Sequence, residues 1–172
     1  GGTEGALTRD AKGSSTDVVD TTKTQGLDVD ETTTDTFTYV ATDGTTTSAP
    51  VNLTITIFGT NDAPIAKADT NWAMEDGPSI TGNVILGEAH GGDPSPVLSF
   101  ADVADTDVDV ETLTVASVNG DAAKVGVAVV GTYGTLTLNA NGTYTYVVDT
   151  SKTQGLDVDE TTTDTFTYVA TD

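Results

Sequence analysis

Acidic side chains recur at regular spacing in one part of the chain, and their chemistry is that of cation ligands. Asp105, Asp107 and Asp109 alternate with other residues directly before an expected strand at 112–118. Alternate carboxylates can converge on one cation if the loop curls, and Ca²⁺ takes about six to eight oxygen ligands. The run lacks the central glycine and the closing glutamate of an EF-hand loop. Both a cation site and a solvated acidic surface remain open for it.

Three further acidic groups could supply oxygen ligands. They are Glu75-Asp76 after the first expected strand of a module, Asn61-Asp62 in a turn-rich junction, and Asp43 with its equivalent Asp172, each ending the sequence TFTYVATD. The acids that begin at Asp28 and at its equivalent Asp157 are better explained as surface charge. These groups fall at the ends of expected strands, so the pairing of the strands would determine which acidic groups lie close together.

Other chemistries find little support in the sequence. Cysteine is absent and His90 is the single histidine, which argues against Zn²⁺. Mg²⁺ usually retains waters and prefers a substrate phosphate. We expect His90 to be a solvated residue of the Gly-rich loop at 87–96. No serine has a base near it in sequence or an elbow motif, and we expect no enzymatic activity.

A long repeat organises the chain. Residues 18–43 recur at 147–172, an offset of 129, with Thr22 against Ser151 as the one difference. Such a period indicates tandem modules. At the same offset, residues 2–17 align with 131–146, where Asn141-Gly142 between alternating segments predicts a hairpin. The first version has lost much of the apolar face of that hairpin, so we expect Gly1–Asp17 to be less ordered or to lie against something else.

Bulk composition limits the fold and the partners. The chain has 172 residues, 36% of them hydrophobic and 6% aromatic, with abundant Thr and Val, which favours thin β-sandwiches. A net charge of −21 argues against nucleic acid, because phosphate binding needs basic patches. No apolar run approaches membrane-spanning length, so we expect no membrane insertion. The chain begins at Gly1, and we expect it to be an excerpt from a longer polypeptide.

Short alternating segments separated by turn signals predict an all-β architecture. The expected strands lie at 36–42, 51–58, 65–69, 79–85, 97–100, 112–118, 124–130, 135–138, 143–148 and 165–170. Helices should be no longer than a turn or two. Two modules follow: residues 1–60 as the C-terminal part of one repeat, ending with the strand at 51–58, and residues 61–172 as the next repeat. The second repeat would lack its last strand, since nothing in it matches the strand at 51–58.

Several motifs occur together in an order that resembles a known family. They are NDAP at 61–64, EDG at 75–77, DTDVDVETLTVASV at 105–118, GTYGTLTLNANGTYTYV at 131–147 and DTFTYVATDG at 35–44. The chain is similar to the VCBS-type, cadherin-like tandem repeats of large bacterial surface proteins, many of them RTX-type adhesins. The resemblance implies Ig- or cadherin-like Greek-key β-sandwich modules in tandem, secreted to the bacterial cell surface.

The same resemblance implies bound Ca²⁺ and a set of ligands. By position these are Asn61, Asp62, Glu75, Asp76, Asp105, Asp107, Asp109, Asp172 and Asp43. One residue departs from the pattern: Val110 stands where the family often has Gly. We therefore expect the loop around Asp109 to be less tightly curled.

Three functions fit these observations. The first is a Ca²⁺-binding structural extender of an extracellular adhesin or biofilm protein, in contact with neighbouring repeats of the same polypeptide. The second is a self-assembling extracellular fibre, in which the strand at 51–58 completes the second module of an identical subunit, head to tail. The third is a carbohydrate-binding module, for which Trp72 is the single tryptophan. Neither the adhesion target, the number of repeats, nor the number of ions follows from the sequence.

Overall fold

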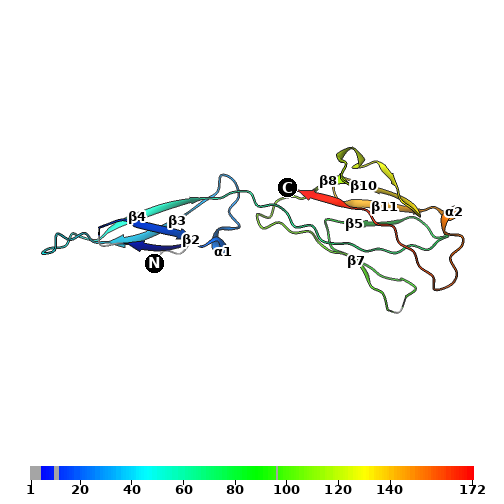
Figure 1. The fold of residues 1–172 in the computed structure, drawn as a ribbon, viewed down its shortest axis with the longest axis horizontal. Coiled ribbons are helices and arrows are strands. Elements are labelled where there is room, and N and C mark those ends of the chain that lie inside the picture. Colours follow the sequence, from blue (N-terminus) through cyan, green and yellow to red (C-terminus); the bar gives the residue numbers. More distant parts are fainter. Residues whose placement is uncertain (1–4, 10–11, 96) are drawn as a thin grey trace. The chain divides into compact units, whose positions relative to one another are not determined.

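The computed structural model describes residues 5–9, 12–95 and 97–172, and the chain divides into two compact units. Unit 1 extends to Asp62 and takes in Val108–Val110 as well. Unit 2 comprises Ala63–Asp107 and Glu111–Asp172. Figure 1 shows the strands of both units along the chain.

The described residues of unit 1 form two antiparallel strand pairs and one short helix. Its elements are β1 (Gly5–Arg9), β2 (Ser15–Val19), α1 (Thr21–Thr24), β3 (Thr32–Tyr39) and β4 (Val51–Phe58). β1 pairs with β2, and β3 pairs with β4 over eight residues, from Thr32 opposite Phe58 to Tyr39 opposite Val51. The Asp20 carboxylate caps α1 by accepting from the Thr22 N–H at 3.2 Å, which suits the first turn of a helix.

Unit 2 carries the larger set of strands. Its elements are β5 (Ile80–Asn83), β6 (Glu88–His90), β7 (Phe100–Asp102), β8 (Thr114–Val118), the 3₁₀ turn η1 (Ala122–Lys124), β9 (Ala128–Val130), β10 (Gly134–Leu138), β11 (Thr143–Val148), α2 (Thr150–Thr153) and β12 (Tyr168–Thr171). One sheet has the order β5-β11-β10-β9. Two smaller antiparallel pairs join β8 to β12 and β6 to β7.

The apolar core of unit 2 explains why these segments form strands. Its buried members are Val84, Ile85, Val115, Val118, Val129, Leu136, Leu138 and Tyr144. Leu136 and Leu138 occupy alternate positions of β10, which places them on one face of the pleated sheet. Leu113, Phe166 and Tyr168 pack against the core. The core is thus built from the four-stranded sheet on one side and the β8–β12 pair on the other, and the all-β sandwich prediction is confirmed.

Strands with strong alternation were predicted with accurate bounds. The strand at 51–58 is β4 and the strand at 143–148 is β11. The turn between β10 and β11 contains Gly142 at φ 81, a conformation that glycine adopts without steric cost. The hairpin prediction for this segment is confirmed.

The predictions at 65–69, 87–96 and 97–100 were wrong, the last because β7 begins only at Phe100. Residues 65–69 form no strand and contribute only a single bridge, Ile65 to Thr106. The segment is held through carboxylates instead of a partner strand: the Lys67 N–H donates to Asp105, and the Asp69 carboxylate accepts from the Val103 N–H. The loop expected at 87–96 contains β6, which pairs with β7.

The weakened first hairpin still forms. β1 and β2 pair in the register of β10 and β11, with Gly5 opposite Val19 as Gly134 is opposite Val148. The side chains of β2 are mostly exposed, whereas β11 is largely buried or half-buried. Pairing is therefore retained although the buried face is reduced. Residues 1–4 and 10–11, also part of the expectation for this segment, lie outside the described residues.

Candidate functional site

Three acidic side chains of unit 2 converge at one end of the β8–β12 pair. Asp107 and Glu111 precede β8, and Asp172 follows β12. The two strands are antiparallel, with Thr171 opposite Thr114, so the end of β12 lies beside the start of β8. One carboxylate oxygen from each of the three acids lies within 4.8 Å of the others. Strand pairing thus brings together acids 61 to 65 residues apart in the sequence.

The donor set of this group, called the Asp107 cluster below, fits a hard cation. Carboxylate oxygens are the preferred protein ligands of Ca²⁺, which accepts them singly or in pairs and tolerates irregular geometry. Asp107 and Glu111 are half-buried and Asp172 is exposed. Three like charges at this separation repel one another unless a cation or protons neutralise them. Sequence analysis selected Asp107 and Asp172 but not Glu111.

The loop between Asp107 and Glu111 curls although it contains no glycine. Val110 has φ 64, in the left-handed region that a β-branched residue rarely adopts. Val110 thus adopts a backbone conformation that glycine would adopt without steric cost. The Val110 side chain is 87% exposed, so no burial compensates for its backbone conformation.

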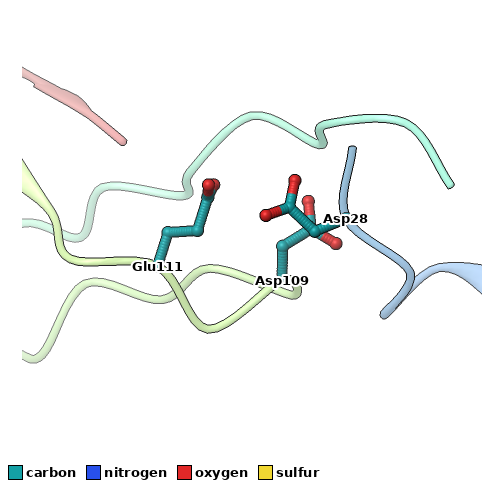
Figure 2. A group of neighbouring side chains, drawn as sticks. All are labelled: Asp28, Asp109 and Glu111. Carbon is teal, nitrogen blue, oxygen red and sulfur yellow. The ribbon is translucent and has the colours of Figure 1, made fainter. Parts of the chain in front are cut away.

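Asp109 belongs with unit 1, where it meets two other acidic residues. Its Oδ2 accepts a hydrogen bond of 2.7 Å from the Asp62 N–H. A carboxylate oxygen of Asp109 lies within 4.8 Å of one from Asp28, and Figure 2 shows the two carboxylates next to each other. Asp28 was read from the sequence as surface charge. Its proximity to Asp109 depends on tertiary structure, for which the local sequence carries no signal.

Asp105 has internal partners that differ from the rest of the acidic run. It is buried, and its Oδ1 accepts from the Lys67 N–H at 2.7 Å. The Tyr168 hydroxyl lies 2.9 Å from the same oxygen. These bonds tie three segments of unit 2 together, and Asp105 is not part of the Asp107 cluster.

Glu75 and Asp76 lie away from the Asp107 cluster. Asp76 Oδ1 accepts from Gln154 Nε2 at 3.1 Å, directly after α2. Figure 1 shows α2 and the C-terminal end of β12 at opposite ends of unit 2. Oε2 of Glu75 is buried and accepts no hydrogen bond from the described residues. The structure therefore separates EDG from the DxDxD run inside this unit.

Asp43 and the Asn61-Asp62 pair are separated within unit 1. Asp43 lies beyond the end of the β3–β4 ladder at which Tyr39 pairs with Val51. Asn61 lies beyond the other end, at which Thr32 pairs with Phe58. An eight-residue strand spans roughly 26 Å. Asp43 accepts from the Thr46 N–H and then the Thr45 N–H, both at 2.8 Å, and these bonds lower the pKa of its carboxyl. Asn61 is exposed, and its Nδ2 lies 3.3 Å from the Asp62 carbonyl.

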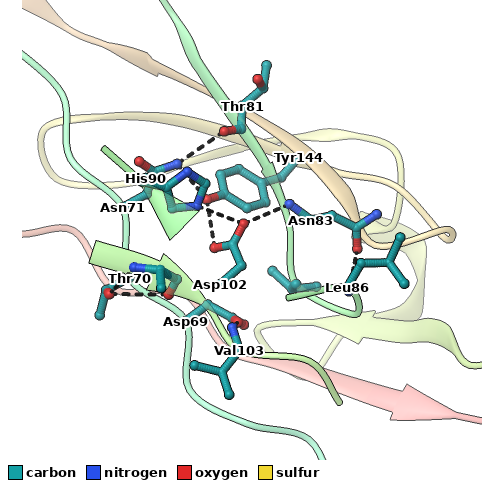
Figure 3. A network of polar contacts seen from close by, with 12 residues as sticks. Asp69, Thr70, Asn71, Thr81, Asn83, Leu86, His90, Asp102, Val103 and Tyr144 are labelled. Atoms are coloured by element: carbon teal, nitrogen blue, oxygen red, sulfur yellow. Dashed lines mark hydrogen bonds and ion pairs between the residues drawn. The ribbon is translucent and has the colours of Figure 1, made fainter. Parts of the chain in front are cut away.

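A buried polar network in unit 2 was missed by sequence analysis (Figure 3). The Asp102 side chain has no exposed surface, and His90 Nε2 lies 2.9 Å from its Oδ2. The expectation of a solvated His90 was wrong, because β6 pairs with β7 and sets His90 opposite Phe100. A glycine-rich sequence gives no signal for such a pairing.

Further donors complete this network around Asp102. The Asn83 N–H donates to Oδ2 at 2.8 Å, and the Tyr144 hydroxyl to Oδ1 at 3.1 Å. Asn71 Nδ2 donates to the Tyr144 oxygen at 2.7 Å. Burial raises the pKa of Tyr144, so the hydroxyl keeps its proton. A Cβ at Gly82 would collide with the Asp102 carboxylate and the Tyr144 hydroxyl. The enclosed arrangement holds β5, β7 and β11 together.

Comparison with known proteins gives one family. The model for the bacterial cadherin-like domain matches residues 61–172. No curated protein matches the chain. The matched range covers unit 2 and nearly two thirds of the sequence, and it includes the sandwich and the Asp107 cluster described above. The chain therefore belongs to the bacterial cadherin-like domain family.

Proposed function

We infer that this chain has the broad function typical of its family. Cadherin-like domains of bacteria are typically adhesive or structural parts of extracellular surface proteins, generally bind Ca²⁺, and are not typically catalysts. Acidic groups suited to a cation are present here. Every helix in the described part of the chain is too short to cross a membrane. Family membership supports an adhesin-type extracellular repeat.

We propose that this repeat is a Ca²⁺-binding structural extender of a secreted or cell-surface bacterial adhesin or biofilm protein. The observation that supports it most directly is the Asp107 cluster, in which β8–β12 pairing gathers three carboxylates. Asp107, Glu111 and Asp172 are the proposed ligands. The other ligands predicted from the sequence remain predictions: Asn61, Asp62, Glu75, Asp76, Asp105, Asp109 and Asp43.

Charge explains how the ion would act. The chain carries a net charge of −21, and such self-repulsion destabilises a compact state. A divalent cation on the Asp107 cluster would cancel repulsion at the loop that precedes β8 and the strand end that follows β12. Extracellular Ca²⁺ modules work at Kd of about 10⁻⁴–10⁻³ M. We infer that a row of such repeats stiffens when the surroundings contain millimolar Ca²⁺ and softens in chelator.

Thermal unfolding tests the proposed ligands. Trp72 is the single tryptophan and lies in unit 2, so its fluorescence reports that unit alone. Ca²⁺ at 100 times its Kd should stabilise unit 2 by about 2.7 kcal/mol, a shift of several degrees. Asp107→Asn, Glu111→Gln and Asp172→Asn should each reduce the shift and weaken Ca²⁺ binding in calorimetry.

Asp159→Asn is the matched control. Asp159 is exposed, lies outside the cluster and has φ 69, which Asn tolerates. This variant should respond to Ca²⁺ like the wild type. Equal stabilisation by Mg²⁺ and Ca²⁺ would mean general charge screening and would overturn the proposal, as would an unchanged Ca²⁺ response in all three cluster variants.

A further inference from the structure

The four-stranded sheet of unit 2 has one face that faces away from the core. Leu136, Leu138 and Tyr144 belong to the core, so the residues that alternate with them lie on the opposite face. This opposite face, called the threonine face below, carries Thr135 and Thr137 of β10, Thr143 and Thr145 of β11, and Thr81 of β5. Thr145 lies opposite Thr137 on one side and opposite Thr81 on the other. Directly opposite residues have Cβ atoms about 5 Å apart, so three hydroxyls form a row across three strands.

Charged side chains are absent from the strands of this sheet. The chain carries 27 acidic and 6 basic residues, yet residues 77–87 and 125–148 contain no Asp, Glu, Lys or Arg. These two ranges hold β5, β9, β10 and β11 entirely. A face that only keeps the protein in solution would share the acidity of the rest of the surface. An uncharged face suits contact with an uncharged ligand.

The internal repeat gives a second reason to assign binding to this face. β1 and β2 of unit 1 pair in the register of β10 and β11. Core-side positions have changed between the copies: Leu138 corresponds to Arg9, Tyr144 to Ser15 and Tyr146 to Asp17. Three positions of the threonine face keep a hydroxyl: Thr137 corresponds to Thr8, Thr143 to Ser14 and Thr145 to Thr16. Thr135 differs, with Ala6 as its equivalent. Hydroxyls retained on a surface whose core side has changed indicate a role in recognition.

A groove borders the threonine face. Its volume is about 540 Å³, within the range of sites that hold small ligands. The segment that follows β5 lines it through Leu86, Gly87 and Glu88. Its other polar lining residues are Thr81, Asn83, Asn139, Thr143 and Thr145. Within the described residues, the hydroxyls of Thr81 and Thr145 form no hydrogen bond, so both can donate to and accept from a ligand.

Hydrogen bonds fix the wall of the groove at Asn83. Its Oδ1 accepts from the Ile85 N–H at 2.9 Å and from the Leu86 N–H at 3.0 Å. Its own N–H donates to the buried Asp102 carboxylate at 2.8 Å (Figure 3). The turn beside the groove is therefore ordered before any ligand arrives, and preorganised groups lose less entropy on binding.

We propose that the threonine face and its groove bind an uncharged saccharide chain. Sugar hydroxyls donate and accept hydrogen bonds, as threonine hydroxyls and asparagine amides do. The threonine methyl groups and Val147, which is 51% exposed opposite Thr135, offer apolar contact to the C–H side of a sugar ring. The Glu88 carboxylate at the groove can accept from a sugar hydroxyl.

Charge disfavours the other classes of ligand. The net charge of −21 repels a polyanion and also a second copy of this chain. A polycation would be drawn to the acidic parts of the surface and away from this face. An open groove binds one saccharide weakly, and repeats that present the same face many times would raise the overall affinity. The inference goes beyond the extender function and requires no metal ion.

Nuclear magnetic resonance titration tests the site on the full chain. Dextran, laminarin, mannan and a chitin oligosaccharide are added in turn to ¹⁵N-labelled protein, in Ca²⁺ and again in chelator. At least one of these neutral glycans should shift the amide signals of Thr81, Thr137 and Thr145 under both conditions. Dextran sulfate is the charged control and should shift none of them. The proposal is overturned if no neutral glycan shifts these signals, or if the shifts fall around Trp72 instead.

Substitutions at Thr145 separate its hydroxyl from its place in the fold. Thr145→Val keeps a β-branched side chain and should weaken glycan binding about fivefold through loss of hydrogen bonding. Thr145→Ser keeps the hydroxyl and should bind nearly as well as the wild type. Thr162→Val is the matched control, because Thr162 is exposed and lies outside the groove. Melts followed by Trp72 fluorescence confirm that unit 2 remains folded. Equal affinity of Thr145→Val and wild type, or an equal loss in Thr162→Val, would contradict the assignment.

Discussion

The Tyr168 hydroxyl donates to the Asp105 carboxylate, 2.9 Å from Oδ1 and 3.0 Å from Oδ2. The carbonyls of Lys67 and Val84 are each 3.1 Å from the same hydroxyl. Burial, together with the neighbouring carboxylates, raises the pKa of Tyr168, so the hydroxyl stays a donor at any ordinary pH. One side chain of β12 thereby fixes the segment that begins unit 2 and the acidic run before the Asp107 cluster.

Tyr168→Phe should destabilise unit 2 by about 1–2 kcal/mol, because it leaves the Asp105 carboxylate without its hydroxyl donor. Thermal unfolding followed by Trp72 fluorescence measures the change. Tyr39→Phe is the matched control at the equivalent position of unit 1, where the side chain is more exposed, and it should alter circular-dichroism melts much less. Equal losses in the two variants would show that the Asp105 contact contributes nothing.

Val110→Gly should stabilise the chain by about 1 kcal/mol, since it removes the strain of a β-branched residue at positive φ. The substitution loses little packing, as Val110 is almost fully exposed. Urea unfolding measures the free energy. Val108→Gly is the control: Val108 is exposed and has no positive φ, so the added chain entropy should cost about 0.5–1 kcal/mol. Loss of stability in both variants would mean that the loop is not strained.

Asp69→Asn should change the pH dependence of unit 2. Burial, aided by the charges of Asp102 and Asp105, raises the pKa of Asp69 to about 6, against about 3.9 in an unfolded chain. Between these values the folded state holds a proton that the unfolded state has released, so the contribution of Asp69 to stability falls as pH rises from about 4 to about 6. Removal of the charge should therefore stabilise unit 2 at pH 7, by roughly 1 kcal/mol or less after solvent screening.

Asp164→Asn should change the stability of unit 2 at pH 7 in the opposite direction to Asp69→Asn, measured over the same pH series. Desolvation alone would raise the pKa of Asp164, but hydrogen bonds from the Tyr146 hydroxyl and the Tyr133 N–H outweigh it and the pKa is lowered. Its stabilisation is present above the unfolded pKa and is lost as pH falls through the folded one. Asp164→Asn should thus be harmful at pH 7 and nearly neutral in strong acid. Parallel pH profiles for the two variants would contradict both assignments.

Asp17→Tyr should stabilise unit 1 by about 1–2 kcal/mol. In unit 2 the Tyr146 hydroxyl donates to Asp164 at 2.7 Å. The equivalent pair in unit 1 is Asp17 and Asp35, and a Cβ built on Gly5 would lie 3.0 Å from Asp17 Oδ1 and 3.2 Å from Asp35 Oδ2. Two nearby carboxylates replace a donor–acceptor pair, and tyrosine would restore the donor.

Tyr146→Asp is the reciprocal variant and should destabilise unit 2, with Trp72 fluorescence as the readout. Circular-dichroism melts of Asp17→Tyr measure the effect on unit 1. If Asp17→Tyr destabilises unit 1, the β1–β2 hairpin has adapted to the Asp17 carboxylate and no longer accepts the tyrosine that stands at the equivalent position 146.

Strand positions with strong local alternation could be predicted from sequence, and those that depend on a distant partner could not. β4 carries four apolar residues at alternate positions, so its bounds were predicted correctly. Residues 65–69 were also predicted as a strand, but the Lys67 N–H donates to Asp105 and the Asp69 carboxylate accepts from the Val103 N–H. Residues 161–167 show the limit of prediction from local sequence, because the same sequence forms a strand at 32–38 and none at 161–167.

Members of the Asp107 cluster could be predicted where the ends of paired strands determine their position. Asp107 and Asp172 flank strands that pair antiparallel, and sequence analysis selected both. Glu111 stands in the same acidic run, yet without the turn at Val110 nothing distinguished it from a surface charge. His90 and Asp102 were missed because the β6–β7 pairing that encloses them has no local signal.

The short connection between β3 and β4 has a consequence for the order of folding. Residues 40–50 join the two strands, so the β3–β4 ladder is a local hairpin, a kind of contact that forms within about 1–10 μs. β12 instead pairs with β8, where Tyr168 lies opposite Val118 from much earlier in the sequence, and contacts of such separation form slowly. In refolding, the β3–β4 ladder should therefore form before the strand pairing that gathers the acids of the Asp107 cluster.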